Sequence, residues 1–101
     1  MNNKNLNREE IIEIIKSIKE FLRYKYSITE IGLFGSFVRG EQNNSSDIDI
    51  LVEFSKYPDL FTFIEIEEYL SNIFSRKVDL VVNDSLKPVI GRFIKKEVLY
   101  I

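Results

Sequence analysis

The feature that most constrains the fold is the start of the run over residues 47–54, where acidic and apolar side chains alternate over 47–50. Asp47 and Asp49 are the acids, and the apolar positions between and after them are Ile48, Ile50 and Val52. A period of two predicts a β-strand with one buried apolar face and one acidic face. Both carboxylates then share a face, with their Cα atoms about 6–7 Å apart. A solvent-facing strand edge shows the same pattern, so other residues must decide whether these acids form a site.

Helical and strand patterns alternate in the first half of the chain. Asn7 and Glu10 match a capping box, which predicts an amphipathic helix over 8–25. Its apolar stripe comprises Ile11, Ile14, Ile15, Ile18, Phe21 and Leu22. A short strand is expected over 28–34, and a helical turn over 36–40.

The second half continues the alternation. Pro58 and Asp59 open a second long helix, residues 77–82 form a third strand, and Ser85 caps a last helix. The apolar faces of these helices are Phe63, Ile66, Leu70 and Ile73 in the first, and Leu86, Ile90, Phe93 and Ile94 in the second. Residues 98–101 are apolar enough for an edge strand or a docking segment. The pattern predicts one domain over 1–101 with an α/β (α+β) fold, in which helices pack on a small sheet.

Composition narrows the possible chemistry. The 101 residues include no histidine and no cysteine, which excludes a Ser-His-Asp arrangement and thiolate zinc sites. Carboxylates remain as metal ligands, and they prefer hard cations such as magnesium. A net charge of −2 argues against direct, non-specific nucleic-acid binding. No apolar run approaches membrane-spanning length and no signal core precedes the first helix, so we expect a cytoplasmic protein without a membrane partner.

A glycine turn precedes the acidic strand. Gly35 permits a positive φ and a close backbone approach to phosphate, and the hydroxyl of Ser36 can bind a triphosphate. Arg39 adds positive charge nearby, although an exposed surface arginine fits the sequence equally well. Gly35-Ser36 alone is only a strand-ending turn. Followed by ten residues and then by Asp47-x-Asp49, it indicates metal-dependent nucleotidyl transfer.

A third acid, Asp79, interrupts the apolar run over 77–82. It is either an outward-facing acid on a half-exposed strand or a member of the same site. If its strand lies beside residues 47–54, Asp79 joins Asp47 and Asp49 on one face. Three such acids suit two magnesium ions, with Asp79 as general base or as a ligand of the second ion.

These residues resemble the minimal nucleotidyltransferases of the DNA-polymerase-β-like superfamily. The resemblance rests on residues 34–40, 46–52 and 77–81, and it covers roughly residues 25–101. It implies the small mixed β-sheet of that family and a nucleotidyltransferase that uses ATP and magnesium. The implied nucleotide-binding residues are Gly35, Ser36 and Arg39, and the implied metal-binding and catalytic residues are Asp47, Asp49 and Asp79.

The resemblance also implies a partner. Larger relatives carry a further domain that binds the acceptor, whereas this chain ends soon after Asp79, so we expect a partner protein to supply the acceptor. Family members of this size resemble antitoxins paired with an all-helical HEPN-domain toxin. The expected reaction is transfer of AMP to a hydroxyl, that of a tyrosine, within a hetero-oligomer. The alternatives are a non-catalytic antitoxin that neutralises its partner by complex formation, and transfer to a small molecule or an RNA end.

Overall fold

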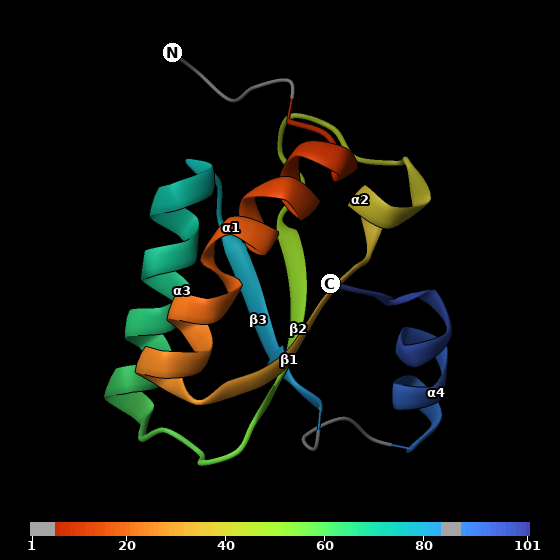
Figure 1. Cartoon of the computed structure of the whole chain (residues 1–101). Coiled ribbons are helices and arrows are strands. Elements are labelled where there is room, and N and C mark those ends of the chain that lie inside the picture. Colours follow the sequence, from red (N-terminus) through yellow and green to blue (C-terminus); the bar gives the residue numbers. More distant parts are fainter. Residues whose placement is uncertain (1–5, 84–87) are drawn as a thin grey trace.

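The computed structural model describes residues 6–83 and 88–101, and Figure 1 shows its arrangement. The elements alternate along the chain as α1 (Arg8–Tyr26), β1 (Ile28–Phe34), α2 (Ser36–Arg39), β2 (Ile48–Phe54), α3 (Leu60–Phe74), β3 (Val78–Val82), α4 (Pro88–Glu97) and β4 (Leu99–Tyr100). Local signals fix two helix starts. Asn7 and Glu10 form the expected capping box of α1, and Asp59 caps α3 by accepting from the N–H of Thr62.

The strands form one mixed sheet in the order β3-β2-β1-β4. β1 is antiparallel to both β2 and β4, whereas β2 and β3 are parallel. Parallel neighbours need a crossover connection, and α3 provides it. The expected small mixed sheet packed with helices is confirmed, and residues 99–100 form the expected edge strand.

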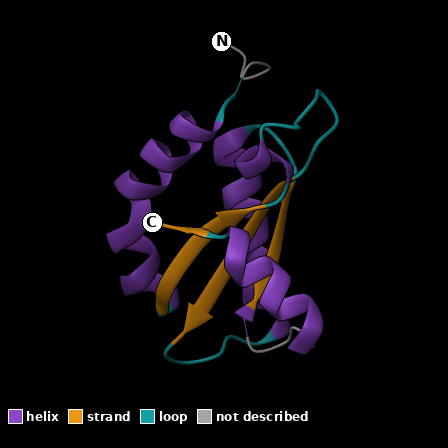
Figure 2. Ribbon diagram, turned by 90° about the vertical axis from the view of Figure 1, so that its right-hand side faces the viewer, coloured by secondary structure: helices purple, strands orange, loops and turns teal. Residues whose placement is uncertain are grey.

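α1 and α3 pack against each other and cover one face of the sheet (Figure 1). The ring of Phe21 lies 5.4 Å from that of Tyr69, and the hydroxyl of Tyr26 donates to Glu65 at 2.7 Å. The core beneath them contains Ile11, Ile15, Leu22, Ile48, Ile50, Val52, Ile66, Leu70 and Phe74. α4 lies apart from both helices, in front of the sheet in Figure 2. The odd-numbered positions of β2, including Asp49, therefore point away from the α1–α3 layer.

The structure corrects one expected position and refines another. β2 begins at Ile48, so Asp47 lies just before the strand and not within it. The ladder to β3 starts there, because the N–H of Ile48 donates to the carbonyl of Lys77 at 3.0 Å. In α3, Phe74 is fully buried, whereas Ile73 is only half-buried. Four residues separate Phe74 from Leu70, and that spacing keeps both on the core side of the helix.

In the last helix, Phe93 is 73% exposed and not on a buried face as expected. This position of α4 therefore faces solvent and not the core. The expected cap Ser85 and the apolar residue Leu86 lie outside the described residues. Over 6–83 and 88–101, no helix is both long and apolar enough to cross a membrane.

Candidate active site

Gly35 ends β1 and begins the turn into α2, and two observations explain why a glycine is there. Its φ is 84° and its ψ is −154°, a backbone conformation that side chains with a Cβ rarely adopt. A Cβ at this position would also clash with the Oδ2 of Asp49 and lie 3.0 Å from its Cγ. The glycine turn and the acidic strand are therefore in direct contact.

Asp49 and Asp79 are neighbours across the parallel pair β2–β3, where they are register partners. Partial burial, followed by the charges of Asp79 and Asp47, raises the pKa of the Asp49 carboxyl to about 6. Asp79 is exposed, and Asp47 is half-buried just before the strand, with an Oδ2 3.9 Å from Lys77 Nζ. The three acids thus lie at one end of two adjacent strands and repel one another.

These acids fit magnesium in the type of donor and in charge. They offer hard oxygen ligands, and the raised pKa of Asp49 shows negative charge that a cation would neutralise. The spacing of these side chains, however, is not that of a formed metal site. Within the part of the chain that the structure describes, no group of three or more acidic side chains is close enough to hold a metal ion. The side chains would therefore have to adjust on binding.

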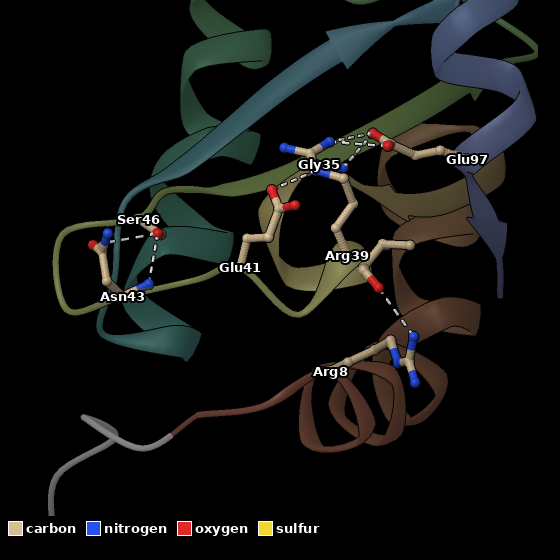
Figure 3. Close-up of polar contacts among 8 residues, drawn as sticks. Arg8, Gly35, Arg39, Glu41, Asn43, Ser46 and Glu97 are labelled. Carbon is tan, nitrogen blue, oxygen red and sulfur yellow. Dashed lines mark hydrogen bonds and ion pairs between the residues drawn. The ribbon is translucent and has the colours of Figure 1, made fainter.

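Arg39, at the end of α2, points toward Glu41 and Glu97 (Figure 3). Its Nη1 donates to both carboxylate oxygens of Glu97, at 2.9 and 3.1 Å, and its Nε donates to Glu41 at 2.9 Å. These bonds to Glu41 and Glu97 raise the pKa of Arg39. Glu97 also accepts from the N–H of Gly35 at 2.9 Å. Arg39 is exposed, and its ion pairs hold the guanidinium next to the N–H of Gly35 through the shared acceptor Glu97.

Ser36 is the first residue of α2 and is half-buried. The N–H groups of Val38 and Arg39 donate to the carbonyl of Gly35, at 3.0 and 3.2 Å. The N–H groups that open a helical turn have no carbonyl partner within the turn, and such groups can bind an anion. Gly35, Ser36 and Arg39 are thus brought together beside Asp49.

Two arginines that the sequence did not single out support this region. Arg76 donates through Nη1 to the carbonyls of Ser46, at 2.7 Å, and Asn43, at 3.2 Å, and its guanidinium lies 5.3 Å from the ring centre of Phe37. Arg8 donates to the carbonyl of Val38 at 3.1 Å, as Figure 3 shows. Arg76 therefore holds the loop that leads into Asp47, and Arg8 holds α2.

Comparisons with known proteins agree with this geometry. The family described as a nucleotidyltransferase domain matches residues 15–101. The protein adenylyltransferase MntA of Thermococcus cleftensis is 47% identical over 96 residues, which cover 95% of this chain and 97% of that protein. A crystal structure of a toxin–antitoxin with AMP-PNP is similar at 28% identity with a TM-score of 0.71, over 89% of this chain and 70% of that one.

A further structural match is the tri-AMPylated Shewanella oneidensis HEPN toxin in complex with MNT antitoxin. Its TM-score is 0.63 at 24% identity, and the match covers 89% of this chain and 66% of that chain. At this identity the likeness shows the fold alone. It confirms that the small mixed sheet with its surrounding helices is an arrangement found in solved structures.

Proposed function

We propose that this chain, which belongs to the nucleotidyltransferase-domain family, transfers AMP from ATP to a hydroxyl of a partner protein. It would thereby act as an antitoxin. The expectation of a nucleotidyltransferase enzyme is confirmed by the family match. The choice of AMP and of a protein acceptor is supported by the 47% identity to a protein adenylyltransferase. The partner we propose is a HEPN-domain toxin, and the acceptor a tyrosine hydroxyl.

The contact between Gly35 and Asp49 carries this proposal. It places a turn that can bind phosphate directly against the half-buried carboxylate, which has Asp79 beside it. Nucleotidyl transfer needs both groups within one triphosphate's length, because catalysis consists mainly of positioning and charge neutralisation. A surface turn and an isolated acidic strand would not have to meet in this way.

In the reaction we propose, Gly35 and Ser36 bind the triphosphate, and Arg39 neutralises part of its charge. The acceptor oxygen forms a bond to the α-phosphorus as the bond to pyrophosphate breaks. Asp79 accepts the proton of the acceptor hydroxyl.

Asp47, Asp49 and Asp79 are the residues that would hold two magnesium ions. When bound, such ions neutralise the triphosphate and lower the pKa of the attacking hydroxyl. The supporting observation is the raised pKa of Asp49, whose carboxylate is destabilised first by partial burial and then by the charges of Asp79 and Asp47.

The candidate partner is the product of the gene beside the one that encodes this chain. The proposal is tested by incubating that purified product with this protein, magnesium and ATP labelled on either the α- or the γ-phosphate. AMP transfer moves only the α label to the partner, whereas phosphorylation moves only the γ label. Asp79→Asn should abolish labelling. Glu68→Gln, an exposed change on α3, should leave labelling intact. Inhibition of the partner without any label on it would instead favour the non-catalytic antitoxin, and label on RNA would favour a nucleic-acid acceptor.

A further inference from the structure

The donors assigned above to the triphosphate already have an acceptor within the chain. Glu97, the last residue of α4, receives the N–H of Gly35 and two contacts from Arg39 Nη1, all between 2.9 and 3.1 Å. Figure 3 shows the carboxylate pointing at both groups. Its side chain is only 27% exposed, so this is a packed contact and not a chance surface pair.

The strand that follows α4 fixes the position of Glu97. β4 pairs with β1 through Leu99 and Leu33, and the N–H of Ile101 donates to the carbonyl of Ile31 at 2.9 Å. Val98 packs so closely over Gly32 that a Cβ on that glycine would clash with it. Because Gly32 has no side chain, Val98 and β4 can pack against β1 directly after Glu97. This packing brings the carboxylate of Glu97 to Gly35.

A carboxylate and a phosphate oxygen compete for such donors, because both are anionic acceptors that prefer an arginine and a main-chain N–H. Glu97 also adds negative charge near Asp49, beside which a triphosphate would have to bind. We infer that Glu97 is an internal competitor that occupies the phosphate-binding donors and must leave when the nucleotide binds. This inference rests on the proposed function, since it concerns the same nucleotide site.

Displacement of Glu97 has a consequence for the C-terminal segment. In the structure, where Glu97 is bonded to Gly35, the end of α4 is connected to the site through Glu97 and to β1 through β4. A bound triphosphate removes the first connection and leaves the second. Nucleotide binding therefore removes one of the two contacts that fix the end of α4. The mobility of α4, which forms part of the surface around the site, should increase as a result.

The test compares the binding of AMP-PNP with magnesium to the wild-type chain, Glu97→Gln and Glu41→Gln by isothermal titration calorimetry. Glu97→Gln keeps the shape of the side chain but removes the charge that competes with phosphate. It should tighten binding about tenfold, which corresponds to about 1.4 kcal/mol. Glu41→Gln is the matched control, because Glu41 contacts Arg39 but not Gly35, and it should change affinity at most about twofold.

Unchanged binding to Glu97→Gln would overturn the inference. Weaker binding would also overturn it and would indicate instead that Glu97 positions Arg39 for the nucleotide. Equal gains in both variants would also overturn it, because they would reflect net charge alone. If none of the three proteins bound AMP-PNP, the proposed nucleotide site itself would fail, and the inference with it.

A second measurement needs no variant of the site. The amide resonance of Gly35 in a ¹⁵N-labelled chain should shift when AMP-PNP and magnesium are added, and the side-chain resonances of Glu97 should move in the same titration. A shift at Gly35 with Glu97 unchanged would contradict displacement, because both groups take part in the same hydrogen bond.

Discussion

At the scale of single residues, Gly35 illustrates how conformation and space together define the site. Both Gly35 and Gly40 have positive φ, but only Gly35 has a carboxylate where its Cβ would lie. We predict that Gly40→Ala costs about 1 kcal/mol of stability from backbone strain alone. Gly35→Ala should cost about 2 kcal/mol or more and weaken AMP-PNP binding, because Asp49 must also move. Urea unfolding and calorimetry measure the two effects, and equal losses in both variants would contradict the contact between Gly35 and Asp49.

Asp49 should reduce stability at neutral pH. Its carboxyl has a pKa of about 6 in the folded chain against 3.8 for an unperturbed aspartate, so the folded state binds more protons between these values. Stability therefore falls as the pH rises from about 4 to about 6, and it stays at the lower value above that window. Because Asp49 is only partly buried, solvent screening reduces the effect to about 1 kcal/mol.

We accordingly predict that Asp49→Asn raises the free energy of unfolding at pH 7 by about 1 kcal/mol relative to the wild-type chain. Urea unfolding measures this gain, and transfer activity should be lost. At pH 4, where the carboxyl is largely protonated in the folded state, the two proteins should differ little. Lower stability of Asp49→Asn at pH 7 would show that Asp49 makes a stabilising interaction as an anion.

Sequence patterns identified those site residues whose signals are local. Asp47 and Asp49 stand out through alternation, and Gly35 through its place at the end of a strand. Glu97 and Arg76 gave no such signal, because their partners lie 62 and 30 residues away and are brought close only by β4 and β3. Residues that meet through tertiary contacts carry no fixed spacing.

At the scale of elements, the loop between α2 and β2 depends on Arg76. This arginine donates to the carbonyls of Asn43 and Ser46, and the carbonyl of Asn43 also accepts from the N–H of Ser46. We predict that Arg76→Ala destabilises the fold by about 1–2 kcal/mol and reduces activity, because Asp47 follows this loop directly. Lys77→Ala is the control for stability, since the lysine is exposed and its contact with Asp47 is long. Equal unfolding midpoints for the two variants would contradict this role of Arg76.

Most element boundaries follow from signals that the sequence shows directly. The capping box of Asn7 and Glu10 set the start of α1, and Gly35 set the end of β1. The start of β2 was missed by one residue, because it depends on the first hydrogen bond to Lys77 and not on the alternation of side chains. The exposure of Phe93 was missed because it depends on how α4 docks.

At the scale of the whole molecule, the residues of the apolar core and the residues of the proposed site lie on opposite faces of the sheet. The face of the sheet beneath α1 and α3 holds the apolar core, and α4 lies on the opposite side (Figures 1 and 2). Asp49 belongs to the opposite face, because it alternates with the buried Ile48 and Ile50. Changes at the acids should therefore leave the fold intact. This separation makes single substitutions at the site interpretable, because a loss of transfer need not reflect a loss of structure.

The most direct test is intact-mass spectrometry of the neighbouring gene's product after incubation with this protein, ATP and magnesium. We predict that the partner gains the mass of one or more AMP units, and that Asp47→Ala, which should fold normally, adds none. A partner that stays unmodified yet is bound and inhibited by the wild-type chain would contradict adenylyl transfer and leave neutralisation by complex formation.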